Sequence, residues 1–220
     1  MNEALKLILI DTCGETAGVA VCEGQQVLAS EDLERGSASA EIVSALKRLL
    51  DKVGWRLKDV DAVGVVNGPG SFTGMRAGLA AAKGLCEAAG LRLAAVSRLE
   101  VLANATALRD GNAVLDAGRG EVYVRDIATG KERVLAIGEV RNVVEGRRVV
   151  AGDGRSAEAL ADWDVVIQQL QVTDSLDAVL RCLKEGGSDV ATIDANYVRG
   201  ESELYRKQGI ATNDMAAGAR

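Results

Sequence analysis

The sequence predicts an α/β protein built from two similar halves. Three observations lead to this class. Short apolar strands joined by tight turns open the chain, strands then alternate with helices, and the same order begins again after residue 109. Alternation of strands and helices is typical of a sheet with parallel strands and helices packed on it. We therefore expect a first lobe at residues 1–108, a smaller second lobe at 109–205, and an unstructured tail at 206–220.

The first half is expected to begin with an antiparallel meander, followed by a helix. The three strands of the meander are predicted at Leu5–Ile10, Thr16–Cys22 and Gln26–Leu33, with tight turns between them. Ser37 or Ser39 is suited to cap the helix, and Gly54 is placed to end it. The helix shows one apolar stripe at helical spacing, made of Ile42, Leu46, Leu49, Leu50 and Val53.

The remainder of the first half alternates strands and helices. A nearly continuous apolar run at Val60–Val66 predicts a strand buried on both faces. A glycine-rich loop then leads into a helix at Met75–Ala89, which Gly90 closes, and a strand at Leu91–Val96 follows. Ser97 is placed to cap a third helix, expected at Leu99–Leu108.

The second half repeats this order more weakly. Strands are predicted at Ala113–Leu115, Glu121–Ile127, Glu132–Ile137 and Arg148–Ala151. Helices are predicted at Ser156–Trp163 and around Leu176 to Leu183. In both halves the first strand ends in an aspartate and a hairpin follows, which suggests a structural duplication.

Composition narrows the function classes. The net charge is -6 and there is no histidine, the commonest general base and a frequent metal ligand. The acidic balance disfavours direct binding of nucleic acid. No apolar run is long enough to cross a membrane, and Met1 to Ile10 reaches Asp11 too soon for a signal peptide, so we expect a cytoplasmic protein. The four cysteines are scattered, as buried apolar groups in a reducing compartment would be.

The glycine-rich loop between the buried strand and the second helix matches no standard phosphate-binding or nucleophile motif in full. Two interpretations remain open. One is a tight strand-to-helix junction with a capped helix and no ligand. The other is an anion site at the helix start, made of backbone and hydroxyl groups of Gly68, Gly70, Ser71, Thr73 and Gly74. Proteolysis by Ser71 would need a base, and none is evident in the sequence.

The second helix is dominated by alanine and glycine, which suggests close approach of another helix. Glycine inside a helix costs up to about 1 kcal/mol, so its presence needs a packing reason. One interpretation is structural: the helix packs on the chain's own sheet. The other is functional: the helix forms a docking face for a partner or a second copy of the chain. The predicted partner-binding residues are Ile42, Leu46, Leu49, Met75, Gly78, Ala81, Ala82 and Leu85.

Asp11 and Asp116 each follow an apolar strand. Carboxylates at strand ends bind metals or orient water, but they also accept backbone N–H bonds in turns. We favour the turn interpretation and predict no metal site and no catalytic residue in this chain. Cys13 lies near Asp11 but has no histidine to activate its thiol.

Several stretches together resemble the bacterial TsaB (YeaZ) family. The resemblance is carried by Ile10-Asp11-Thr12, Gly68 through Gly74 with Arg76, Ala82-Lys83-Gly84-Leu85, Val96-Ser97-Arg98-Leu99-Glu100, Asp116-Ala117 with Glu121-Val122-Tyr123, and Tyr197-Val198-Arg199. It implies the fold of actin, sugar kinases and Hsp70, with two related lobes of mixed sheets and flanking helices.

The resemblance also implies a function. Members of this family are non-catalytic subunits that pair with the catalytic subunit TsaD and the ATPase TsaE. The complex makes N6-threonylcarbamoyladenosine at position 37 of tRNAs. ATP or ADP and the metal are then expected on the partner subunits, none on this chain alone, and tRNA contact only through the complex. Alone, the chain is expected to form a homodimer. The alternative is an actin-fold ATP-dependent phosphotransferase or hydrolase that uses Asp11 or Asp116 with a metal.

Overall fold

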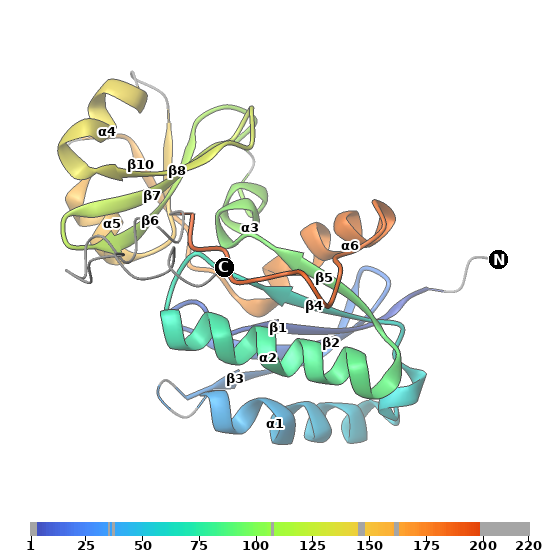
Figure 1. Ribbon diagram of the computed structural model, residues 1–220. Coiled ribbons are helices and arrows are strands. Elements are labelled where there is room, and N and C mark those ends of the chain that lie inside the picture. Colours follow the sequence, from blue (N-terminus) through green and yellow to red (C-terminus); the bar gives the residue numbers. More distant parts are fainter. Residues whose placement is uncertain are drawn as a thin grey trace, which may run out of the picture.

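The computed structural model describes residues 4–34, 36, 38–106, 108–144, 148–160 and 163–198, and shows two five-stranded sheets in two lobes (Figure 1). In the first sheet the strands lie in the order β3-β2-β1-β4-β5. The meander pairs antiparallel, whereas β1, β4 and β5 run parallel. The strands are β1 (Lys6–Asp11), β2 (Ala17–Glu23), β3 (Gln26–Leu33), β4 (Ala62–Val66) and β5 (Arg92–Val96).

Helices cover both faces of this sheet (Figure 1). On one face α1 packs on β2 and β3, and α2 packs on β4 and beside α1. On the other face η2 packs on β1 and β2 and α6 packs on β5, while α3 lies beyond them, against the second sheet. The strands β1, β2 and β4 are therefore sealed from water on both sides, which agrees with the continuous apolar run of β4, whereas β3 keeps exposed residues. The helices are α1 (Ala38–Val53), α2 (Phe72–Ala89), α3 (Arg98–Asn104) and α6 (Leu176–Lys184), with short 3-10 turns at η1 (Leu57–Asp59) and η2 (Val172–Ser175).

The second sheet repeats the first. Its order is β8-β7-β6-β9-β10, with an antiparallel meander on one side of β6 and parallel strands on the other. This confirms the restart predicted from the sequence, although α4 and β10 were not predicted. The elements are β6 (Asn112–Gly118), β7 (Glu121–Asp126), β8 (Glu132–Ala136), α4 (Ile137–Val144), β9 (Val149–Ala151), α5 (Gly154–Ala159) and β10 (Val165–Ile167).

The local signals for helix ends act as expected. The Ser71 hydroxyl accepts from the backbone N of Gly74 at the start of α2, and Ser97 accepts from Leu99 at the start of α3. Gly90 ends α2 in the left-handed region with φ of 66°. Of the two candidate caps for the first helix, Ser39 lies inside the helix, and Ser37 lies outside the described residues, as does the tail predicted at 206–220.

The end of the chain corrects the expected lobe boundary. Residues 170–198, assigned from the sequence to the second lobe, pack on the first. Val172 and Val179 are buried in the core of the first sheet, and Ser188 pairs with Leu93 of β5. A Cβ at Gly64 of β4 would lie 2.5 Å from Val179, so this glycine allows α6 to approach the sheet closely. The second lobe therefore ends before η2, and the chain crosses back.

Candidate functional site

The glycine-rich loop is packed tightly against the turn between β1 and β2. Ideal Cβ atoms at Gly70, Gly74 and Gly78 would overlap atoms of Cys13 or Thr12 at less than 3.0 Å. The backbone N of Ser71 donates to the Cys13 carbonyl at 2.9 Å. The close packing accounts for these glycines without a ligand, as the interpretation as a tight junction expects.

A cavity nevertheless lies beside this junction. It has a volume of about 140 Å³ and is enclosed by the β1–β2 turn and the starts of α1 and α2. Ser71, Thr73 and Gly74 line it, whereas Gly68 lies under Met75 and the carbonyl of Asn196. The structure thus separates the five predicted anion-loop residues, and an anion site at this cavity stays a prediction.

The first strand-end aspartate, Asp11, lies buried below the cleft between the lobes. Its Oδ1 accepts from the backbone N of Cys13 at 2.8 Å, which is the turn-forming role favoured from the sequence. Burial raises the pKa of the Asp11 carboxyl, and the positive charge of Arg98 partly offsets this effect. Asp11 therefore has a structural role: its side chain is 4% exposed and holds the turn after β1.

Cys13 is unsuited to act as a nucleophile. Its Sγ donates to the Val66 carbonyl at 3.0 Å, and the residue is 2% exposed. Burial and the nearby Asp11 raise the pKa of the Cys13 thiol well above its usual value. Because the thiolate is the nucleophile, this thiol is inert near neutral pH.

The second strand-end aspartate, Asp116, belongs to the second lobe and lines a cleft between the two lobes. Its Oδ1 accepts from the backbone N of Gly118 at 3.0 Å, and its Oδ2 lies 3.5 Å from the Arg155 guanidinium. Its own backbone N donates to Asp153 at 2.9 Å. Sequence reasoning missed Asp153, although an aspartate three residues before Ser156 is a typical N-cap signal, and it does cap α5.

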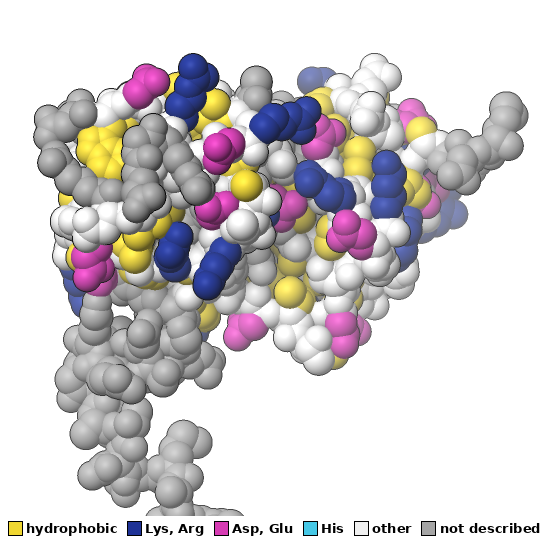
Figure 2. All heavy atoms as spheres, turned by 90° about the horizontal axis from the view of Figure 1, so that it is seen from above, with side chains coloured by type: hydrophobic (Ala, Val, Ile, Leu, Met, Phe, Trp, Pro, Cys, Tyr) yellow, Lys and Arg dark blue, Asp and Glu magenta, His cyan; other side chains and the backbone are white. Residues whose placement is uncertain are grey.

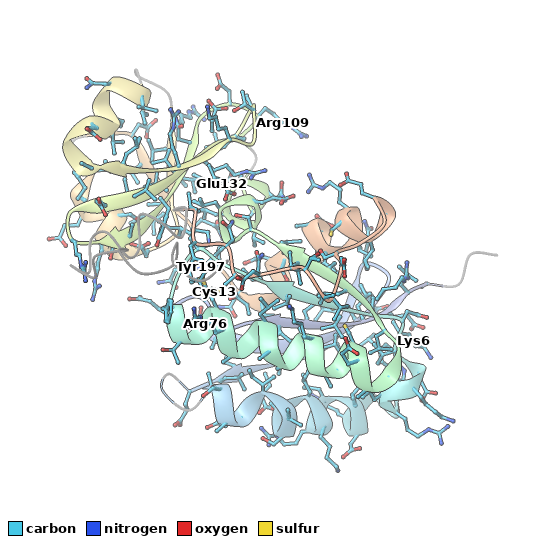
Figure 3. All side chains as sticks on the ribbon, viewed as in Figure 1. Lys6, Cys13, Arg76, Arg109, Glu132 and Tyr197 are labelled. Atoms are coloured by element: carbon cyan, nitrogen blue, oxygen red, sulfur yellow. The ribbon has the colours of Figure 1, made fainter. Side chains whose placement is uncertain are left out.

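The two lobes are joined above this cleft by Glu132 of β8. Its carboxylate accepts from the Ser97 hydroxyl at 2.5 Å, from Arg125 at 2.8 Å and from the Asn196 amide at 3.0 Å. The same terminal segment places the Tyr197 hydroxyl 2.9 Å from Arg76 Nε at the start of α2. Figure 3 shows Cys13, Tyr197 and Arg76 close to the junction of the lobes, with Glu132 above them.

Most of the predicted partner-binding residues face inward. Ala81 and Leu85 are half-buried, but the other six are buried in the chain's own core. The apolar stripe of α1 meets the chain's own sheet, although Leu46 also lines a groove on the outer side of the helices. Direct contact of these residues with a partner stays a prediction. The six are Ile42, Leu46, Leu49, Met75, Gly78 and Ala82.

The outer side of the same helices does expose apolar surface. Val43 is 64% exposed, and it lines a groove of about 310 Å³ with Leu85 and Trp55. Further along α2, Gly84 is exposed, and a Cβ there would meet no atom within 4 Å. Gly84 therefore differs from Gly74 and Gly78, because nothing within the described chain requires a glycine at this position.

Charge on the opposite side of the molecule is mixed. On the face seen in Figure 2, basic and acidic side chains of the described residues are interspersed and form no field of one sign. Within the described part of the chain, no group of three His, Cys, Asp or Glu residues could hold a metal ion. In the same part, no helix is long and apolar enough to cross a membrane.

Known structures share this arrangement. The chain is similar to YeaZ from Pseudomonas aeruginosa, with a TM-score of 0.71 and 24% identity over 86% of this chain and 97% of that one. It is also similar to an uncharacterized protein with similarity to peptidase YEAZ from Pseudomonas aeruginosa, with a TM-score of 0.73 and 24% identity over 89% and 100%.

A more distant match is the activator of the 2-hydroxyisocaproyl-CoA dehydratase from Clostridium difficile with bound ADPNP. It has a TM-score of 0.50 and 13% identity over 82% of this chain and 95% of that chain. Together these structures confirm the predicted actin-like fold with two lobes.

The family itself is shown by the sequence. Residues 36–155, more than half of the chain, match the family model described as TsaD: tRNA N6-adenosine threonylcarbamoyltransferase. This match and the YeaZ fold confirm the resemblance inferred from the motifs. The chain belongs to the TsaD family, and within it has the fold of YeaZ.

Proposed function

We propose that this chain is the non-catalytic TsaB-type subunit of the complex that makes N6-threonylcarbamoyladenosine at position 37 of tRNAs. In this role it docks on the catalytic TsaD subunit, together with the ATPase TsaE, and positions the catalytic subunit. Its membership of the TsaD family and its similarity to YeaZ support the proposal. Nucleotide and metal chemistry then belongs to the partners, and tRNA is reached through the assembled complex.

The observation that carries the docking proposal is Gly84. A glycine in the interior of an 18-residue helix costs about 1 kcal/mol relative to alanine. Gly74 and Gly78 are required by Thr12, but a Cβ at Gly84 would meet no atom within 4 Å, and Gly84 lies on the outer side of α2. A residue without a side chain on the exposed face of a helix allows another helix to approach until the two axes are about 8 Å apart.

The residues around Gly84 also suit the approach of another helix. Ala80 and Ala88, one turn away on either side, are exposed and equally small. The groove lined by Val43, Leu85 and Trp55 adds apolar surface. A partner of the same family carries the corresponding pair of helices, and two such pairs can pack face to face. When TsaD is absent, a second copy of this chain would occupy the face as a two-fold dimer.

The alternative, a phosphotransferase or hydrolase that uses Asp11 or Asp116, has less support. Asp11 is 4% exposed and already holds the turn after β1. Within the described residues, Asp116 belongs to no group of three His, Cys, Asp or Glu that could hold a metal ion. ATP turnover by the purified chain alone, lost on Asp11→Asn, would favour this alternative over the scaffold role.

The docking proposal is tested by Gly84→Leu, with Gly138→Leu as the matched control. Gly138 is an exposed helical glycine on α4 of the second lobe, and a Cβ there also meets nothing within 4 Å. Both variants should fold as well as the parent. Gly84→Leu should weaken binding of the TsaD subunit by tenfold or more, about 1.4 kcal/mol, and Gly138→Leu should leave it unchanged. Equal binding by both variants would refute the assigned face.

A further inference from the structure

A buried arginine at the cleft between the lobes has an unsatisfied donor. Arg98 is 8% exposed, and its Nε is buried without a hydrogen-bond partner among the described residues. Its backbone N donates to the Gly68 carbonyl at 2.6 Å, which anchors the residue beside the glycine-rich loop. Nε itself has almost no accessible surface, so an acceptor in the cleft would reach the guanidinium through its terminal nitrogens. Buried donors are nearly always paired, so this guanidinium is suited to an acceptor supplied by a ligand.

Arg98 lines a pocket between the two lobes, with a volume of about 150 Å³. The first lobe contributes Glu15 and Ser71 beside Arg98. The second lobe contributes Asp116 and Asp153 with Arg155. Cys13 also lines this pocket, and Figure 3 shows Cys13 at the junction of the lobes. The pocket is distinct from the outer faces of α1 and α2 and does not depend on partner docking.

The charges on the walls restrict the ligand. Opposite Arg98, the second lobe presents two carboxylates that are held together by the 2.9 Å bond from the Asp116 backbone N to Asp153. Arg155 pairs with Asp116, but its side chain is 76% exposed, so water screens much of its charge. Glu15 adds a further acidic group on the near wall.

Neither a simple anion nor a simple cation fits this arrangement. A phosphate would be attracted by Arg98 but repelled by Asp116, Asp153 and Glu15, and the nearby buried Asp11 carboxyl also interacts with the Arg98 charge. A cation would bind the carboxylates but leave the buried Arg98 donor without an acceptor. A small molecule with both charges satisfies both walls, because its carboxylate accepts from Arg98 and its ammonium group donates to the acidic wall.

We propose that this cleft binds a small zwitterion of the α-amino-acid class, with Arg98 as the partner of its carboxylate and Asp116 and Asp153 as partners of its ammonium group. The site requires both lobes. Its occupant would therefore bridge them, in addition to the link through Glu132.

The first test is a titration of the full chain followed by NMR of the arginine Nε–H signals, with Arg98 assigned through Arg98→Lys. The probes are the standard amino acids, acetate and inorganic phosphate at matched ionic strength. At least one amino acid should shift the Arg98 signal saturably, and acetate and phosphate should bind roughly tenfold more weakly or worse. The proposal is overturned if no amino acid shifts the signal, or if phosphate or acetate shifts it as strongly.

The second test uses variants and the same amino acid, measured by calorimetry. Arg98→Met should abolish binding, and Asp116→Asn should weaken it roughly tenfold while acetate binding is kept or gained. Asp116→Asn retains an oxygen acceptor for the backbone N of Gly118, so this variant should fold. It therefore keeps the proposal testable if Arg98→Met fails to fold. Arg92→Met, at an exposed arginine of β5, is the matched control and should bind normally. Unchanged binding by Asp116→Asn would overturn the two-sided site.

Discussion

Alanine substitutions at two glycines of α2 should change stability in opposite directions. Gly84 is exposed and a Cβ there meets nothing within 4 Å. Alanine is favoured over glycine in a helix interior by about 1 kcal/mol. Gly84→Ala should therefore raise the free energy of unfolding by about 0.5–1 kcal/mol.

Gly78 lies on the same helix but faces the turn after β1. A Cβ there would overlap Thr12 Oγ1, and this hydroxyl donates to the Gly74 carbonyl at 2.6 Å. Either Thr12 rotates and loses a bond of about 1 kcal/mol, or α2 shifts at an overpacking cost of about 1–3 kcal/mol. After the helical gain of about 1 kcal/mol is subtracted, Gly78→Ala should be neutral to about 2 kcal/mol less stable than the parent.

The two variants are compared by urea unfolding followed by circular dichroism, with thermal unfolding as a second measurement. Gly84→Ala should unfold at higher urea than the parent, and Gly78→Ala at the same or lower urea. For a chain of this size, each 1 kcal/mol corresponds to about 2–4 °C in Tm. If Gly78→Ala stabilises the chain as much as Gly84→Ala, the packing of α2 against Thr12 is wrong.

Three further predictions follow from the same contacts. Glu132→Gln, which weakens the bond from Ser97 across the lobes and the bond from Arg125 within the second lobe, should lower the free energy of unfolding by about 1–3 kcal/mol in urea. Burial raises the pKa of Asp11, so its neutral form stabilises the fold at low pH and this contribution is lost as the pH rises through the folded pKa. Asp11→Asn should then keep or raise stability at pH 7, and a marked loss there would contradict the assignment. Cys13 should react with iodoacetamide at pH 8 far more slowly than the half-buried Cys182, as mass spectrometry of peptides would show.

Much of the fold could be predicted from local patterns. The strand predicted at Gln26–Leu33 has the bounds of β3, and Ser71, Ser97 and Gly90 mark helix ends as expected. These signals act within a few residues, so they survive in the folded chain. In the second sheet, the strand predicted at Arg148–Ala151 corresponds to β9, but β10 was not predicted because its three residues are too few for a clear periodicity.

The candidate sites were less predictable, because they depend on which side of a helix faces out. The stripe with Ile42 and Leu46 was assigned to docking, but the same spacing is what a helix needs to bury against its own sheet. Only three-dimensional packing separates Gly84, where a Cβ would meet open space, from Gly78, where a Cβ would overlap Thr12. Arg98 was missed as a site residue because the pocket that it lines is completed by Asp116, Asp153 and Arg155 of the second lobe, which lie far from it in the sequence.

The mass of the complex formed with the TsaD subunit tests the central claim most directly. In sedimentation or native mass spectrometry, the parent chain and Gly138→Leu should form a heterodimer with TsaD, whereas Gly84→Leu should remain largely free. A heterodimer formed equally well by Gly84→Leu would contradict the docking of TsaD on the outer side of α2.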